Sequence, residues 1–195
     1  MNNILITGHK KGLGKFLKNY FSKEKYKVFT LNNKIYKKKI IFKFILHCAA
    51  RRPHYKKKYT NLNYIDSNIF LTLKLTKLNF KRFIYISSVD VYPKMKKKIE
   101  TKKIDYNKLS TIYQISKYTS ERILLNICPK KTLILRLPSL IGKEMQQNVF
   151  YDIIFSKKKK IKTHYSNKSV FNLISYNSVL KIILKIIEKN KIGIF

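Results

Sequence analysis

The sequence predicts an α/β protein with a doubly wound, mainly parallel β-sheet. Short apolar segments alternate along the chain with segments of helical periodicity. The apolar segments are continuous, which is typical of strands that helices cover on both faces. No internal repeat or linker divides the 195 residues into two full domains. A chain of this length can bury a core of its own, so we expect one domain with at most a small appendage.

Five strands are expected from the apolar runs. The first covers 3–7 and is followed at once by a glycine, which indicates a turn. The others are rich in Ile, Leu, Phe and Tyr and cover 26–31, 43–48, 82–87 and 131–137. Only about a dozen residues separate the second strand from the third. A helix and a strand that a doubly wound sheet normally has there should therefore be shortened or missing.

Four helices are expected from apolar residues that recur with the helical period. In the first, residues such as Leu13 and Leu17 share one face. In the longest, Ser110 is expected to be the N-cap. The four predicted segments are 12–22, 63–79, 110–127 and 178–189.

The net charge of +35 at pH 7 suggests a nucleic-acid-binding protein, but the composition argues against one. Only five of the 44 basic residues are arginine, the residue that most often reads bases through paired hydrogen bonds. The lysines lie all along the chain and accompany many Ile, Asn, Phe and Tyr, all residues with A/T-rich codons. We therefore do not expect nucleic acid as a partner. A selected polyanion-binding surface is the alternative.

Cysteine usage and hydropathy indicate a cytoplasmic protein. Cys48 and Cys128 lie far apart, a pattern that predicts neither a disulfide framework nor a metal site. The N-terminus runs straight into the first strand, without a secretory signal. No apolar stretch approaches the roughly 18 residues of a membrane helix. We expect no metal and no membrane association.

The segment Thr7-Gly8-His9-Lys10-Lys11-Gly12-Leu13-Gly14 predicts a Rossmann-type dinucleotide site. It follows a strand and opens a helix, as such a motif must. Gly8 allows the tight turn, Gly12 lets the backbone approach a pyrophosphate, and Gly14 lets the helix pack on the strand. Three of the five glycines of the chain lie here. We expect Thr7 and Leu13 to lie beside the same ligand; a plain strand–helix turn is the alternative.

Tyr113, Lys117 and Ser88 are the candidate catalytic residues. Tyr113 and Lys117 lie four residues apart, which places both on one face of the predicted helix. An ammonium group beside a phenol favours the phenolate, so the tyrosine can exchange protons near neutral pH. Ser88 ends a parallel strand, where open α/β sheets bind ligands. Each signal also has a simpler interpretation when taken alone. Tyr113 and Lys117 would be a chance pair in a chain rich in Tyr and Lys, and Ser88 would belong to a serine turn.

These motifs occur in an order that resembles the extended short-chain dehydrogenases, the NAD-dependent epimerase/dehydratase family. The resemblance covers most of residues 3–142. It includes His47-Cys48-Ala49-Ala50, similar to a strand end beside the cofactor, and Lys81 to Ser88 with Val91-Tyr92. It also includes Leu135-Arg136-Leu137-Pro138-Ser139 with Gly142, similar to the loop on the nicotinamide side. The resemblance implies that Ser88, Tyr113 and Lys117 form the catalytic triad, and that His47, Ala49, Ala50 and Pro138 lie at the cofactor.

The chain departs from the family pattern at several positions. The glycine spacing matches the compact, single-domain branch of the short-chain dehydrogenases. Where an aspartate usually holds the ribose of NAD, Asn32, Asn33 and Lys34 follow the second strand. Asn32 and Lys34 are therefore expected at the cofactor, and NADP is slightly favoured over NAD. Of the acidic pair that family dehydratases carry after the catalytic hydroxyl, only Asp90 is present.

The resemblance implies an NAD(P)-dependent epimerase or reductase that transfers hydride at a carbon of a nucleotide-activated sugar. Residues 1–142 are expected to form the dinucleotide-binding Rossmann domain. Residues 143–195 are expected to form a small, reduced substrate-side lobe packed on it. A homodimer is compatible with this reading. Two alternatives remain: a catalytically degenerate dinucleotide-binding protein with a regulatory or assembly role, and a lysine-rich nucleic-acid-binding protein on the same scaffold.

Overall fold

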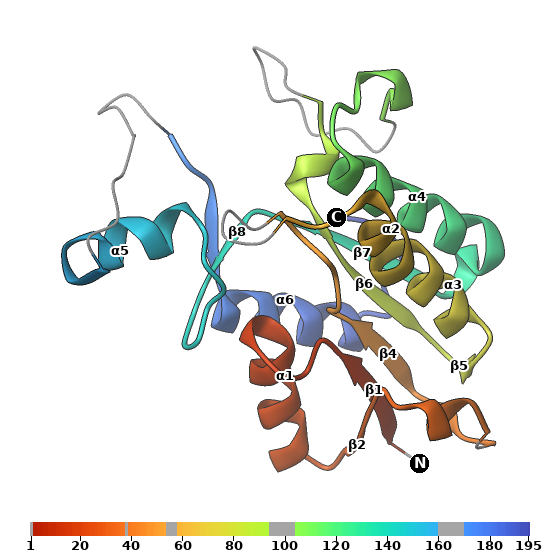
Figure 1. Ribbon diagram of the computed structural model, residues 1–195. Coiled ribbons are helices and arrows are strands. Elements are labelled where there is room, and N and C mark those ends of the chain that lie inside the picture. The colour runs from red at the N-terminus through yellow and green to blue at the C-terminus, as the bar shows by residue number, and fades with distance from the viewer. Residues whose placement is uncertain (1, 38, 54–57, 94–103, 160–169) are drawn as a thin grey trace.

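The protein is built around a parallel sheet, as the sequence predicts, but the sheet has six strands where five were expected. The computed structural model describes residues 2–37, 39–53, 58–93, 104–159 and 170–195. The strand order is β10-β7-β6-β4-β1-β2 (Figure 1). The strands are β1 (Asn3–Thr7), β2 (Lys27–Thr30), β4 (Phe44–His47), β6 (Phe83–Ser88), β7 (Thr132–Leu137) and β10 (Gly193–Ile194).

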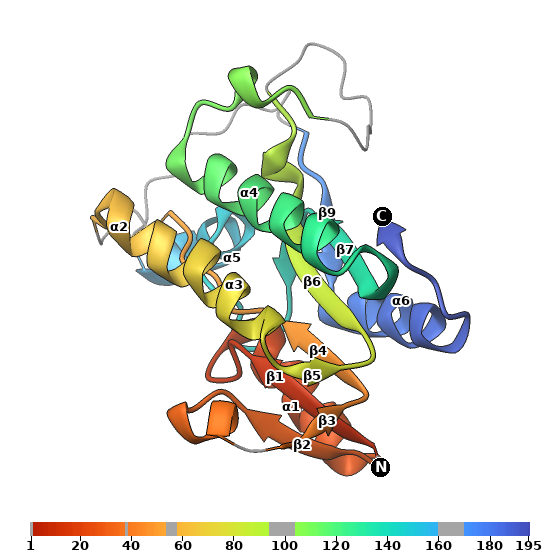
Figure 2. The ribbon, with the colours of Figure 1, turned by 90° about the vertical axis from the view of Figure 1, so that its right-hand side faces the viewer.

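Helices cover both faces of the sheet (Figures 1 and 2). Ile4 and Ile6 of β1 pack with α1 (Gly12–Lys23) and α6 (Tyr176–Glu188). Leu5, between them in sequence, packs on the opposite face with side chains of α3 (Leu71–Thr76) and α4 (Ile112–Ile127). Successive residues of a strand point to opposite faces, so the continuous apolar strand fills both cores.

Two predicted helix starts are wrong by one or two residues, and a third helix is divided. Thr111, not Ser110, caps α4 by accepting from the Gln114 N–H, and the Ser110 N–H and hydroxyl donate to the Gln114 side chain. The last helix begins at Tyr176 after a Ser175 cap. The helix predicted over 63–79 consists of α2 (Asn61–Tyr64), a π-helical turn, η2 (Ile65–Phe70), and α3.

The segment between β2 and β4 is shortened, as predicted. It holds a 3₁₀ helix, η1 (Asn33–Lys37), and β3 (Ile41–Phe42). β3 pairs with β5 (Asn79–Phe80) in a separate two-stranded ladder. β4 pairs with β1 on the side away from β2. Among the described residues, no strand pairs with the outer edge of β2.

The chain from residue 139 onward contributes to two places. α5 (Val149–Lys159) extends away from the sheet, and β8 (Ser139–Ile141) pairs with β9 (Leu173–Ser175) (Figure 1). α6 and β10 then return to the main sheet. The remaining short helices are η3 (Val89–Val91), η4 (Tyr106–Lys108) and η5 (Pro129–Lys131). No helix in the described part of the chain is long and apolar enough to cross a membrane.

Candidate active site

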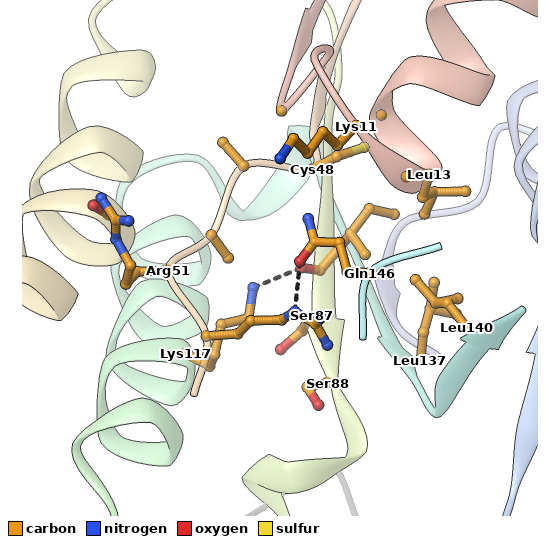
Figure 3. Close-up of a pocket in the computed structure, with 18 of the residues that line it drawn as sticks. Lys11, Leu13, Cys48, Arg51, Ser87, Ser88, Lys117, Leu137, Leu140 and Gln146 are labelled. Carbon is orange, nitrogen blue, oxygen red and sulfur yellow. Dashed lines mark hydrogen bonds between the residues drawn. The ribbon is translucent and has the colours of Figure 1, made fainter. Parts of the chain in front are cut away.

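A cavity of about 1180 Å³ opens at the carboxyl edge of the sheet (Figure 3). Its walls are the glycine turn, the loop after β4, the ends of β6 and β7, one face of α4, and the loop before α5. Ligands of open α/β sheets bind at this edge. Most of the residues predicted to bind a cofactor or substrate therefore come together in one place.

The glycine turn has the geometry of an anion-binding site. Gly8 and Gly12 have φ of +69° and +55°, values that side-chain-bearing residues rarely adopt. A Cβ on Gly14 would collide with the carbonyl oxygen of Gly8. The N-cap of α1, Lys11, makes no side-chain cap hydrogen bond, whereas Thr60, Thr111 and Ser175 cap α2, α4 and α6. The first turn of α1 thus presents N–H groups to the cavity, a donor set that fits a pyrophosphate.

Thr7 and His47 lie beneath the cavity floor and are fully buried. The Thr7 hydroxyl hydrogen bonds with His47 Nδ1 at 2.7 Å and accepts the Ala49 N–H at 3.1 Å. His47 Nε2 hydrogen bonds with the Thr72 hydroxyl at 3.0 Å. Burial, and to a lesser extent Lys117, lowers the pKa of His47 to about 3. A neutral His47 therefore fixes the loop that carries Ala49, which itself lines the cavity.

Ser88, Tyr113 and Lys117 all line the cavity. Ser88 donates to Asp90 Oδ2 at 3.0 Å, and its hydrogen bond with Tyr113 acts to lower the pKa of Tyr113. Burial has the larger and opposite effect, and with Asp90 it raises the pKa of Tyr113 to about 12. The expectation that a neighbouring lysine favours the phenolate is therefore wrong for this structure, because loss of solvation raises the pKa of Tyr113 and the positive group that acts to lower it is Arg52.

Lys117 is almost completely buried. Its amine donates to the Ile86 carbonyl at 2.6 Å and lies 4.0 Å from the centre of the Tyr85 ring. Burial lowers the pKa of Lys117 to about 7, while Glu121 and then Cys48 act to raise it. The lysine can therefore gain or lose a proton near neutral pH.

The other predicted cofactor residues fall into two groups. Leu13, Ala49, Ala50 and Pro138 line the cavity. Asn32 and Lys34 are exposed and are not among the lining residues, although Leu31, just before them at the end of β2, is. The polar side chains after β2 thus lie next to the cavity and not in its wall.

The motifs did not indicate the residues that face the glycine turn from the far wall. An added Cβ on Gly12 would lie 3.1 Å from the Tyr176 hydroxyl and 3.7 Å from Gln146 Cγ. Arg52 donates to Gln146 Oε1 at 2.5 Å and to the Gln147 carbonyl at 2.6 Å, so it bridges the two sides of the cavity. Gln146 and Tyr176 belong to no recognisable pattern, and only the folded chain places them here.

Asn68 is a further residue that the sequence did not indicate. It lies in the π-helical turn, is buried, and exchanges two hydrogen bonds with the backbone of Arg51, at 2.6 and 2.9 Å. Its amide also donates to the Ser116 hydroxyl at 2.9 Å, next to Lys117 on α4. Asn68 therefore fixes the loop after β4 against the helix that carries Tyr113 and Lys117. A π-helical turn at such a site is a common feature of functional regions.

Residues 4–190 match the sequence model of the NAD dependent epimerase/dehydratase family. The chain belongs to this family. The resemblance of the sequence motifs to extended short-chain dehydrogenases is thereby confirmed. A search of curated proteins found no match.

Solved structures of other proteins have the same fold at low sequence identity. UDP-glucuronic acid 4-epimerase from Bacillus cereus, in complex with UDP-glucuronic acid and NAD, superposes with a TM-score of 0.79 and 16% identity over 98% of this chain and 76% of that one. dTDP-4-dehydrorhamnose reductase from Bacillus anthracis, in complex with NADP, gives 0.76 and 20% identity over 100% and 74%. At such identities the similarity establishes the fold alone.

Proposed function

We propose that the protein is an NAD(P)-dependent epimerase or reductase that acts on a nucleotide-activated sugar. The observation that carries this proposal is the presence of Ser88, Tyr113 and Lys117 in one cavity with the glycine turn. A chance Tyr–Lys pair in a lysine-rich chain would have no reason to face a phosphate-binding turn. Membership of the NAD dependent epimerase/dehydratase family supports the same function.

The chain supplies a site for a nicotinamide dinucleotide. We propose that the N–H groups at Gly12 and Leu13 bind its pyrophosphate, that Ala49 and Ala50 lie along it, and that Pro138 lies at its nicotinamide end. When bound, the nicotinamide would accept or release the hydride. No acidic residue follows β2 before β4 to hold a ribose hydroxyl, and Lys34 stands there instead. This favours NADP at least as much as NAD.

The catalytic roles follow from the protonation states of the side chains. Tyr113 keeps its proton at neutral pH, so it can donate that proton to an oxygen of the sugar. Ser88 can donate a hydrogen bond to the same oxygen and orient it. Lys117, with a pKa near neutrality, can supply positive charge or pass a proton.

Two arginines support a substrate that carries phosphate. Arg51 and Arg52 line the cavity, and no acidic side chain of the described residues forms an ion pair with either. Guanidinium groups bind phosphate oxygens in pairs of hydrogen bonds. The diphosphate of a nucleotide-activated sugar suits such a pair, and structures with the same fold contain the nucleotide sugar UDP-glucuronic acid.

The proposal is tested with a panel of UDP- and dTDP-sugars and with NAD(H) and NADP(H). Tyr113→Phe is expected to bind the cofactor normally and to lose about 10²–10⁴-fold in rate on the substrate that the wild type turns over. The matched control is Tyr118→Phe, which removes another phenol of α4 that donates to the Ile104 carbonyl at 3.2 Å. Equal rates in Tyr113→Phe and the wild type would overturn the assigned role.

The shortened β2 edge favours a second candidate function. The described residues add no strand beyond β2, the side on which the adenosine half of a dinucleotide usually lies. A family member that binds a ligand without turnover, in a regulatory or assembly role, is compatible with that loss. Cofactor binding with no turnover of any sugar in the panel would favour this second candidate.

A further inference from the structure

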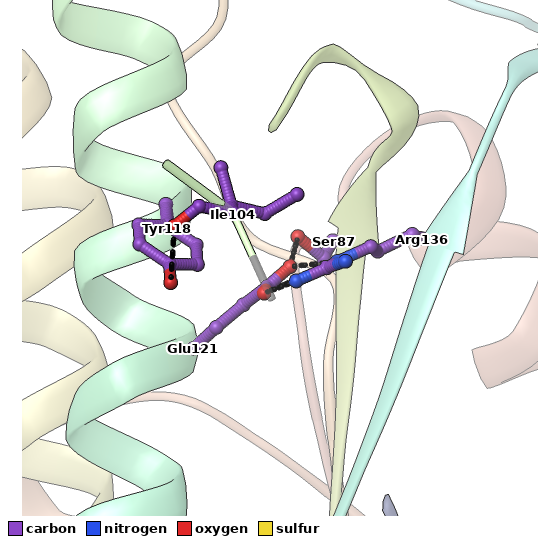
Figure 4. Close-up of polar contacts among 5 residues, drawn as sticks. All are labelled: Ser87, Ile104, Tyr118, Glu121 and Arg136. Carbon is purple, nitrogen blue, oxygen red and sulfur yellow. Dashed lines mark hydrogen bonds and ion pairs between the residues drawn. The ribbon is translucent and has the colours of Figure 1, made fainter. Parts of the chain in front are cut away.

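Glu121 lies at the centre of a buried polar network (Figure 4). Its side chain is completely buried. It accepts a hydrogen bond from the Ser87 hydroxyl at 2.5 Å and forms an ion pair with Arg136, whose Nη2 lies 2.6 Å from Oε2. The Arg136 Nε lies 3.1 and 3.2 Å from the two carboxylate oxygens. Replacing one partner of such a buried pair leaves an uncompensated charge, so the network constrains all three residues.

Each partner of Glu121 is adjacent to a residue of the active site. Ser87 precedes Ser88 at the end of β6, and Arg136 precedes Leu137 and Pro138 at the end of β7. Lys117 lies one turn before Glu121 on α4, and i, i+4 residues share a face of a helix. One carboxylate therefore connects the three elements that carry the catalytic serine, the catalytic lysine and the nicotinamide-side loop.

The groups that face Lys117 define its charge. Glu121 faces it from α4, on which Tyr113 lies one turn before it, His47 and Cys48 face it from the end of β4, and the Tyr85 ring faces it from β6. On β7, Arg136 is already paired with Glu121. His47 is neutral, and burial raises the pKa of both Cys48 and Tyr113 to about 12. Glu121 is thus the negatively charged group near Lys117 among the described residues, and it opposes the effect of burial on the lysine.

We propose that Glu121 is a positioning residue, which keeps Lys117 charged near neutral pH and fixes the ends of β6 and β7 relative to α4. It touches neither the cavity nor a ligand, so it acts only through Lys117, Ser87 and Arg136. Its consequence for turnover rests on the proposed function. Its effect on the charge of Lys117 does not, because that charge belongs to the protein itself.

The test is a pH titration of the full-length protein labelled with ¹³C at lysine Cε and followed by NMR. In the wild type, one lysine signal is expected to titrate near neutral pH, and the signal is expected to be absent from Lys117→Met. In Glu121→Gln, the midpoint is expected to fall by about 1–3 pH units, as is typical when a close opposite charge is lost. An unchanged midpoint in a folded Glu121→Gln protein would overturn the proposal.

Glu121→Gln leaves Arg136 buried without its partner, so it can fail to fold. The double variant Glu121→Gln/Arg136→Met removes both charges and leaves no unpaired ion. Its Lys117 midpoint is also expected below that of the wild type, and an unchanged midpoint would again contradict the proposal. Ser87→Ala keeps the carboxylate and removes one hydrogen bond, so its midpoint is expected to stay within a few tenths of a unit. Tyr118→Phe, on the same helix, is the matched control and is expected to titrate like the wild type.

A second readout separates positioning from simple structural support. In Glu121→Asp the charge remains but the side chain is one methylene shorter, so the lysine midpoint is expected near the wild-type value. Glu121→Gln is expected to lower kcat more than it raises KM, with its pH–rate profile displaced in the same direction as the lysine midpoint. If the lysine midpoint of Glu121→Gln is displaced but the wild type turns over no sugar, the proposal for Glu121 stands and the proposed function is refuted. If the wild type and Glu121→Gln both turn over a sugar with the same pH–rate profile, the proposal for Glu121 is refuted and the proposed function stands.

Discussion

His47 is predicted to make the protein sensitive to mild acid. Its pKa is about 3 in the folded protein, compared with 6.5 for a free histidine, and burial is the main cause. Between these two values the unfolded chain binds a proton that the folded chain excludes, so stability is complete above pH 6.5 and falls as the pH decreases towards 3. Since each pH unit in this range corresponds to about 1.4 kcal/mol, the loss reaches roughly 2 kcal/mol at about pH 5.

The assay is urea unfolding of the wild type, His47→Gln and His9→Gln at pH 7 and pH 5. His47→Gln is expected to be less stable at pH 7, because the hydroxyl of Thr7 or Thr72 loses its partner, and to lose little more at pH 5. His9→Gln is the matched control, since His9 lies in the glycine turn and is only partly buried. Burial, and then Lys18 and Lys10, lower the pKa of His9, so this variant should retain most, but not all, of the acid sensitivity of the wild type. An equal loss in His47→Gln and the wild type would refute a neutral, buried His47.

Three further predictions concern the site. Gly14→Ala, whose Cβ would meet the backbone of Gly8, should cost about 1–3 kcal/mol in the free energy of unfolding and weaken cofactor binding; unchanged affinity would contradict the packing of the turn. Because Lys34 follows β2 and no acidic residue lies between β2 and β4, NADPH should bind at least as tightly as NADH in a direct titration. A clear preference for NADH would show that another group holds the ribose. Lys117→Ala should reduce both cofactor affinity and rate, whereas Ser88→Ala should reduce the rate alone. Equal effects of the two substitutions on cofactor affinity would contradict the separate roles assigned to Lys117 and Ser88.

The sequence predicts the sheet, most of its helices and the position of the site. These depend on local signals: continuous apolar strands, glycines at a turn, and the spacing of Tyr113 and Lys117 on one helix face. The catalytic candidates could be placed because each lies on a regular element whose end is defined by the sheet. The shortened β2–β4 connection was predictable for the same reason, because too few residues are present there for a helix and a strand.

Features that depend on contacts distant in sequence could not be predicted. The two-residue strand β10 has no pattern of its own and forms only by pairing with β7. Glu121 has no pattern of its own in the sequence, and nothing there indicates that Arg136 pairs with it until the fold buries the two together. The raised pKa of Tyr113 depends on burial, which the Tyr–Lys spacing does not report. The choice between Ser110 and Thr111 as cap was a choice between two adjacent hydroxyl residues, and only the side-chain geometry decides it.

The most direct test of the account is a titration of the protein with NADH and with NADPH, followed by nicotinamide fluorescence. Saturable binding to the wild type is expected. Gly12→Asp is expected to lose that binding, because a carboxylate would stand against the pyrophosphate at a position of φ +55°. Circular dichroism of Gly12→Asp should match that of the wild type, because aspartate tolerates this backbone conformation better than most residues. Undiminished affinity in Gly12→Asp, or no saturable binding by the wild type, would show that the glycine turn does not bind a nicotinamide dinucleotide.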